Sequence, residues 1–155
     1  MGYTSRFLTL TKGTGVINRI FHSYGEYTGD MEGRRNGALI SMENGKAVAF
    51  AIFNLQARGE MFVTHNDPVY EGMIVGLSSK SGDLEINVLK GKKLTNMRTQ
   101  GTDENVVLTP VRKIAIAEQL SMLNTDEALE ITPKSCRLRK LVLDPHERKR
   151  QSRAK

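Results

Sequence analysis

The chain has 155 residues, of which 39% are hydrophobic and 26% charged, and its net charge is +6. This length fits one ordinary domain, with or without part of a neighbour, and excludes a large multidomain enzyme. The longest uncharged apolar run, 47–53, has seven residues and is too short to cross a bilayer.

The cellular compartment of the protein can be inferred from its cysteine content and its N-terminal sequence. The first twenty residues lack the apolar block of a secretory signal peptide. The single cysteine, Cys136, cannot form an internal disulfide. Both features favour a reducing compartment, and we expect the cytoplasm, with an organellar stroma as the alternative.

The first part of the chain has the pattern of a helix followed by a strand. We expect a helix over 5–11, a turn at 13–15, and a strand that carries the apolar residues between Val16 and Phe21. The next segment, 24–36, is rich in glycine and charge, which is typical of a linker. A domain boundary is therefore predicted there.

From residue 37 onward the pattern becomes rich in strands. The dipeptide Asn44-Gly45 favours a tight hairpin, so strands are predicted on either side of it, at 38–42 and 46–52. A short helical turn is predicted at 53–58 and should end at Gly59. Further strands are expected at 61–64, 73–78 and 84–88.

The segment 89–105 has no strand-like alternation and no aromatic residue, which predicts an exposed loop. Its 17 residues exceed the usual length of a connection in a compact domain, and this length favours a binding role.

The last third of the chain combines strands with two short helices. Asp144 followed by Pro145 is typical of a helix start, with the aspartate as the cap. The other elements predicted here are strands at 106–108, 129–132 and 137–143 and a helix at 116–123. We therefore predict a mainly β fold with short helices, of the α+β class.

Positive charge is concentrated in two segments. Residues 134–155 contain nine basic and two acidic residues, and residues 86–102 contain four basic and no acidic ones. The remainder of the chain carries a net charge of −5. Two basic segments on a slightly acidic body indicate a polyanionic partner, with a solvated basic tail as the alternative.

Motifs of catalysis are absent from the sequence. Both Gly-Lys pairs, at 45–46 and 91–92, lack the flanking residues of a phosphate-binding P-loop. The three histidines have no His or Cys partner at metal-ligand spacing, and no Gly-x-Ser-x-Gly motif occurs. We therefore expect no catalytic residue, metal, cofactor or small-molecule substrate in this chain.

The predicted loop contains the residue types that bind RNA. Its lysines can neutralise phosphates, and Arg98 offers a planar guanidinium for bidentate bonds. Because the loop has no aromatic residue for base stacking, structured RNA is favoured over an unpaired strand. The candidate RNA-binding residues are Asn87, Lys90, Lys92, Lys93, Thr95, Asn96 and Arg98, and a secondary basic surface is expected at Lys134, Arg137, Arg139 and Lys140.

Several motifs of the chain resemble one protein family. The run 90–98 reads Lys-Gly-Lys-Lys-Leu-Thr-Asn-Met-Arg and is followed by Gly-Thr-Asp-Glu at 101–104. Together they strongly resemble the C-terminal domain of the BipA/TypA translational GTPases. The resemblance continues in family order at 7–15, 33–37, 53–59, 69–73 and 132–135, so it covers essentially the whole chain.

The resemblance implies that the chain is a C-terminal fragment. Residues 1–30 would be the last helix and strand of a truncated ferredoxin-like domain, shared with elongation factor G, together with a linker. Residues 31–155 would be the family-specific domain with its basic tail. The GTPase domain, with its GTP and magnesium, would lie upstream in the parent protein.

The resemblance also implies the partners. In the family the long loop reaches the peptidyl-transferase end of the ribosomal A site. The expected partners are therefore the large ribosomal subunit, its rRNA and the acceptor end of A-site tRNA, with no membrane. The parent would be linked to stress adaptation and ribosome assembly. The alternative is a protein-interaction or structural domain with a solvated basic tail.

Overall fold

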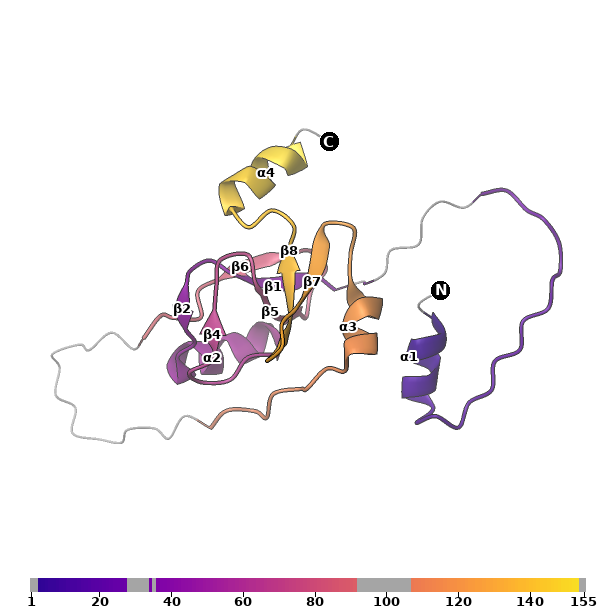
Figure 1. Cartoon of the computed structure of the whole chain (residues 1–155), viewed down its shortest axis with the longest axis horizontal. Coiled ribbons are helices and arrows are strands. Elements are labelled where there is room, and N and C mark those ends of the chain that lie inside the picture. Colours follow the sequence, from indigo (N-terminus) through magenta and orange to yellow (C-terminus); the bar gives the residue numbers. More distant parts are fainter. Residues whose placement is uncertain (1–2, 28–33, 35, 92–106, 154–155) are drawn as a thin grey trace, which may run out of the picture.

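The structure is a computed structural model that describes residues 3–27, 34, 36–91 and 107–153. It has an α+β architecture rich in strands, as predicted (Figure 1). In chain order the elements are α1 (Tyr3–Leu10), β1 (Ala38–Ser41), β2 (Gly45–Lys46), α2 (Ala49–Leu55), the 3₁₀ helix η1 (Gln56–Arg58), β3 (Gly59–Met61), β4 (Pro68–Val69), β5 (Ile74–Ser78), β6 (Leu84–Ile86), α3 (Ile116–Met122), β7 (Glu127–Ile131), β8 (Cys136–Lys140) and α4 (Pro145–Arg153).

The central sheet has the strand order β3-β5-β1-β6. Strand β1 pairs antiparallel with β5 and parallel with β6. All four residues of β1 are buried, so both faces of this strand are covered. Because successive side chains of a strand point to opposite faces, Leu39 enters one hydrophobic cluster while Ala38 and Ile40 enter another.

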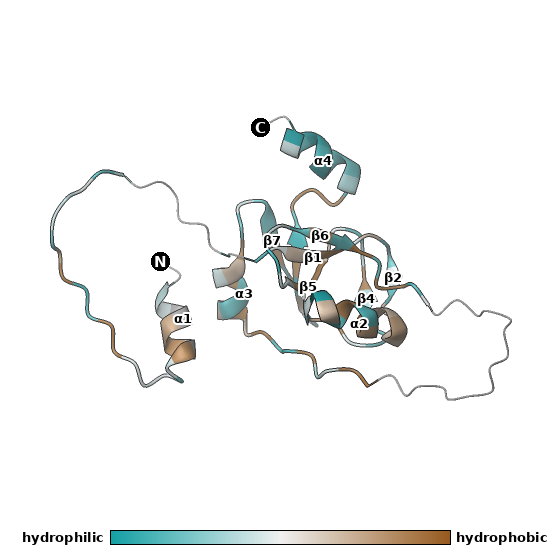
Figure 2. Ribbon diagram, turned by 180° about the vertical axis from the view of Figure 1, so that it is seen from behind, coloured by the Kyte–Doolittle hydropathy of each residue, from teal (hydrophilic) through white to brown (hydrophobic). Residues whose placement is uncertain are grey.

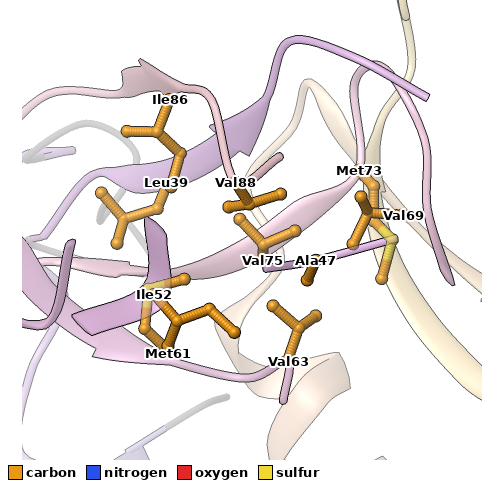
Figure 3. Close-up of a cluster of buried hydrophobic side chains, with 10 residues drawn as sticks. All are labelled: Leu39, Ala47, Ile52, Met61, Val63, Val69, Met73, Val75, Ile86 and Val88. Carbon is orange, nitrogen blue, oxygen red and sulfur yellow. The ribbon is translucent and has the colours of Figure 1, made fainter. Parts of the chain in front are cut away.

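The larger cluster lies on the face of the sheet that α2 covers. Figure 3 shows its ten side chains directed toward one another, with Ile52 of α2 opposite residues of the sheet. Its members are Leu39, Ala47, Ile52, Met61, Val63, Val69, Met73, Val75, Ile86 and Val88. Each fully buried aliphatic side chain in such a cluster contributes about 1.5–3 kcal/mol relative to an exposed one.

The β7–β8 hairpin covers the opposite face. Its residue Leu138 is buried in the smaller cluster with Ala38, Ile40 and Ile74. The backbone attaches the hairpin to the sheet as well, because the amide of Lys140 donates to the carbonyl oxygen of Gly72 at 2.9 Å.

The structure overturns the predicted hairpin at Asn44-Gly45. Strand β2 pairs with β4 instead of β1, and residues 49–52, which were expected to continue it, form the first part of helix α2. The side chain of Asn44 accepts a hydrogen bond from the amide of Glu71 at 2.9 Å. Tertiary packing decides this region, since the helix buries Ala51 and Ile52 against the sheet.

The predicted strand between Val16 and Phe21 is also wrong. Residues 14–27 have no regular structure, and Val16 and Phe21 are 80% and 72% exposed. A strand requires a hydrogen-bonded neighbour, and the described residues provide none for this segment. The predicted strand near 106–108 is absent at Val107 and Leu108, and residue 106 lies outside the described ranges.

Other predicted elements are confirmed. Helices at 5–11 and 116–123 correspond to α1 and α3, and strands at 73–78 and 84–88 correspond to β5 and β6. Helix α4 begins as predicted, because Asp144 Oδ1 accepts a hydrogen bond from the amide of His146 at 2.6 Å. Helix α1 lies beside α3 in both views of the molecule (Figures 1 and 2).

Candidate nucleic-acid interface

The predicted RNA-binding loop is described only at its base. Asn87 and Lys90 are described, whereas Lys92, Lys93, Thr95, Asn96 and Arg98 lie outside the described residues. The described part of this site is therefore the segment that enters the loop, residues 87–91.

The base of the loop is fixed to the core. The amide of Val48 donates to the carbonyl oxygen of Val88 at 2.9 Å, and Val88 is fully buried. Leu89 lies against Gly45, where an added Cβ would come within 2.2 Å of the leucine side chain. Gly45 thus permits a close approach of two chain segments, which is the role that the hairpin prediction missed.

The side chain of Asn87 makes hydrogen bonds within the protein. Its Nδ2 donates to Glu43 Oε1 at 2.7 Å, and its Oδ1 accepts from the amide of Leu89 at 2.9 Å. Asn87 therefore holds the loop base in position. Lys90 is exposed and has no ion pair with any described residue, so its ammonium group is available to an anion.

A groove beside the loop base brings in residues that the sequence analysis did not single out. It has a volume of about 330 Å³ and is bordered by α2, η1 and the segment 87–90. Its lining residues are Phe50, Ala51, Asn54, Leu55, Arg58, Asn87 and Lys90. We call it the loop-base groove. No local sequence signal joins residues 50–58 to residues 87–90, since only the fold places them together.

The predicted secondary basic surface is only partly exposed. Lys134 is exposed, whereas Arg137 and Arg139 on β8 are half-buried. Arg137 lies directly across from Glu130 of β7 in the strand register. This face of the hairpin therefore carries charges of both signs.

A tyrosine from the segment after β4, Tyr70, forms a hydrogen bond with the same hairpin. The Tyr70 hydroxyl donates a short hydrogen bond to Glu130 Oε2. Burial, followed by this hydrogen bond and the negative charge of Glu130, raises the pKa of Tyr70 to about 12. The carboxylate of Glu130 is thus engaged within the protein.

The prediction that Lys140 belongs to a basic surface is wrong. The residue is 1% exposed, and its Nζ lies 2.5 Å from Asp83 Oδ2, 2.7 Å from Asp126 Oδ2 and 3.0 Å from Glu127 Oε1. Strand alternation explains the difference, because Arg137 and Arg139 share one face of β8 while Lys140 lies on the other.

Lys140 belongs to a network of charges that also contains Arg34, with Lys140, Glu127 and Arg34 buried and Asp83 and Asp126 at its exposed edge. The Arg34 guanidinium makes two bonds to Glu127, of 2.7 and 3.2 Å. Burial opposes the charge of Lys140, but hydrogen bonds to Asp126, Asp83 and Glu127 outweigh it and raise the pKa of Lys140. Burial likewise opposes the charge of Asp83, yet hydrogen bonds from the Ala38 amide and Lys140 lower the pKa of Asp83. The network therefore stabilises the fold and is not a surface for a partner.

Helix α4 divides its basic residues between two environments. Arg148 Nη2 lies 3.1 Å from Glu85 Oε1, and Arg148 Nη1 donates to the Val142 carbonyl oxygen at 3.0 Å. Arg150 and Arg153 are exposed. The helix extends away from the sheet and is coloured as hydrophilic along its length (Figure 2).

The described residues contain neither a metal-binding cluster nor a membrane-spanning helix. No group of three or more His, Cys, Asp or Glu side chains in 3–27, 34, 36–91 and 107–153 is arranged to hold a metal ion. None of the helices within these ranges has the length and apolar character needed to span a membrane.

Comparison with known proteins defines the family. A family model described as the TypA/BipA C-terminal domain matches residues 36–145. The matched region contains the sheet, the loop base and the β7–β8 hairpin. The chain therefore belongs to the BipA/TypA family.

Curated relatives of the chain are large ribosomal subunit assembly factors named BipA. The identity is 51% over 154 residues with the protein of Buchnera aphidicola subsp. Schizaphis graminum, covering 99% of this chain and 25% of the relative. The identity is 48% over 155 residues with the protein of Escherichia coli strain K12, covering 99% of this chain and 26% of the relative. The chain thus spans about a quarter of the length of the curated relatives it matches.

Proposed function

We propose that this protein binds the large ribosomal subunit and that the loop 89–105 contacts RNA. The observation that carries the proposal is Lys90, an exposed cation without a carboxylate partner among the described residues, at the end of a loop base that is hydrogen-bonded to the core. A cation presented in this way is available to phosphate. The name of the relatives, large ribosomal subunit assembly factor, supports the same partner.

The proposed contact extends from Asn87 to Arg98. The cations of this segment neutralise phosphates, and its amides and hydroxyl add neutral hydrogen bonds. The targets are large-subunit rRNA and the acceptor end of A-site tRNA. The contributing residues are Asn87, Lys90, Lys92, Lys93, Thr95, Asn96 and Arg98.

We propose the following domain organisation and parent activity. Residues 1–30 are the end of a ferredoxin-like domain with a linker, and residues 31–155 are the family-specific domain with its basic tail. The parent protein is a cytoplasmic translational GTPase that uses GTP and magnesium in an upstream domain. It acts in stress adaptation and ribosome assembly.

Charge reversal in the loop tests the proposed RNA contact. The double variant Lys92→Glu/Lys93→Glu is expected to lose co-sedimentation with purified large subunits, because two phosphate contacts become repulsive. The matched control is Lys12→Glu/Lys80→Glu, which makes the same change in net charge at exposed lysines outside the loop. Circular dichroism checks that both variants are folded. Undiminished sedimentation of the loop variant would refute the assignment.

Salt dependence separates this proposal from a protein-interaction domain with a solvated tail. A contact with several phosphates loses affinity steeply between 50 and 200 mM salt, whereas a mainly apolar protein interface does not. The pairing of Arg148 with Glu85 reduces the tail charge that is available to RNA, because this charge is neutralised within the domain.

A further inference from the structure

The loop-base groove has a lining suited to an anion. Two of its lining residues, Arg58 and Lys90, are cations, and none is acidic. The nearby carboxylate of Glu43 is bonded to Asn87 Nδ2 at 2.7 Å. The groove therefore has positive charge on both of its walls, from η1 on one side and from the loop base on the other.

The guanidinium of Arg58 has no partner within the described part of the chain, although the backbone of this residue is fixed. Its carbonyl oxygen accepts two hydrogen bonds from Ser79, from the amide and from Oγ, both at 2.9 Å. The exposed side chain has no ion pair or hydrogen bond with any described residue. In contrast, Arg34 and Arg148 are paired with carboxylates. A positioned but unpaired guanidinium is suited to bind phosphate.

The groove also supplies the aromatic surface that the loop sequence lacks. Phe50, Ala51 and Leu55 of α2 line it beside Lys90. The loop itself has no aromatic residue for base stacking, but the fold places Phe50 at the loop base. An apolar wall next to two cations matches a nucleotide, which has a flat base and a charged phosphate.

Asn54 provides a hydrogen-bond acceptor in the same groove. Its Nδ2 donates to the Phe50 carbonyl oxygen at 2.8 Å, which fixes the side chain. Its Oδ1 has no partner among the described residues. This oxygen can accept a bond from the amino group of a base or from a ribose 2′-hydroxyl.

We infer that the loop-base groove binds one unpaired nucleotide of the RNA. Arg58 and Lys90 hold its phosphate, Phe50 and Leu55 contact its base, and Asn54 Oδ1 accepts a hydrogen bond. The inference rests on the proposed RNA-binding function and adds to it a ligand class, an unpaired nucleotide beside structured RNA. It also extends the interface from the loop to α2 and η1.

Two matched RNA probes test this inference with the full 155-residue chain. One is an RNA hairpin with a four-nucleotide single-stranded end, and the other is the same hairpin with a blunt end. The unmodified protein is expected to bind the first roughly tenfold more tightly in a fluorescence anisotropy titration, since stacking and charge-assisted bonds are gained only there. Equal affinity for the two probes would overturn the inference.

Substitutions in the groove test which residues cause the preference for the single-stranded end. Arg58→Gln and Asn54→Ala are each expected to reduce the preference for the single-stranded end severalfold, and Arg58→Lys should retain part of it. The control Lys80→Gln removes an exposed cation outside the groove that is likewise unpaired among the residues described, and it should keep the full preference. If the preference is unchanged in both Arg58→Gln and Asn54→Ala, the inference that the groove binds the nucleotide is also wrong.

The loop variant separates the two proposals. Lys92→Glu/Lys93→Glu is expected to weaken the binding of both hairpins. If it does so while the groove variants have no effect, the proposed function stands and the groove assignment is wrong. If the loop variant leaves both affinities unchanged, or the unmodified chain binds neither RNA, the proposed function itself fails.

Discussion

Lys140 Nζ lies 3.0 Å from Glu127 Oε1, and both side chains are almost completely buried. Glu127 is also bonded to Arg34, and Lys140 to Asp83 and Asp126, so each charge of the pair has further partners of opposite sign. Such a network tolerates burial because no charge within it is left unpaired. It joins the segment before β1, the β5–β6 turn and both strands of the β7–β8 hairpin.

Removal of Lys140 should therefore be strongly destabilising. We expect Lys140→Met to lower the free energy of unfolding by about 3 kcal/mol or more, because the buried carboxylate of Glu127 loses its ammonium partner and retains Arg34 and the Asn124 amide. Urea unfolding measures the change. The control Lys134→Met, at an exposed position just before the same strand, should lie within about 0.5 kcal/mol of the unmodified protein. A small effect of Lys140→Met would show that the network contributes little.

Because of Tyr70, the stability of the folded protein should fall as the pH rises in the alkaline range. Its pKa is about 12 in the folded protein and 10.0 ordinarily, so the folded state holds the phenolic proton more tightly. This contribution to stability is complete below pH 10 and is lost as the pH rises toward 12. Ultraviolet titration of the phenolate should show one tyrosine ionising near pH 12.

Two variants test whether Tyr70 is the tyrosine that ionises near pH 12. Tyr70→Phe should remove the ionisation near pH 12, whereas Tyr24→Phe should leave it in place, because Tyr24 is 95% exposed. Lys140, whose pKa is raised, also loses its stabilising charge in strongly alkaline solution, so unfolding of Tyr70→Phe by urea should still show a residual loss there. If the ionisation near pH 12 persists in Tyr70→Phe, its assignment to Tyr70 is wrong.

Gly59 is predicted to be intolerant of a side chain. A Cβ at this position would lie 1.9 Å from the carbonyl oxygen of Leu77, so the β3–β5 backbone pairing would have to move. We expect Gly59→Ala to destabilise the protein by about 1–3 kcal/mol in thermal unfolding. Gly91→Ala is the matched control, because an added Cβ there meets nothing within 4 Å. Equal melting temperatures for the two variants would contradict the prediction.

Local signals in the sequence predicted some elements well. Asp144 before Pro145 marks the start of α4, and the apolar residues of 73–78 and 84–88 suit β5, which is mostly buried, and β6, in which Ile86 is buried. These signals involve neighbouring residues, so they do not require knowledge of the remote parts of the fold.

Remote contacts explain the errors. Residues 49–55 form a helix because Ala51 and Ile52 pack against strands that lie elsewhere in the chain. Lys140 is buried because its partners include Asp83, more than fifty residues away. Likewise, the proposed role of Arg58 depends on the fold, which places it in the same groove as Lys90. Charge counting along the sequence cannot separate an internal cation from one that faces a partner.

The attachment of the β7–β8 hairpin to Gly72 has a consequence for biosynthesis. Leu138 and Lys140 close the smaller cluster and the ionic network, yet they are translated well after β1, β5 and Asp83. Ala38, Ile40 and Ile74 therefore lack the cover of Leu138 on the nascent chain until the hairpin has been made, at a synthesis rate of about 5–20 residues per second. During that interval the incomplete domain exposes an apolar face, and a chaperone that recognises such faces would have its opportunity to bind then.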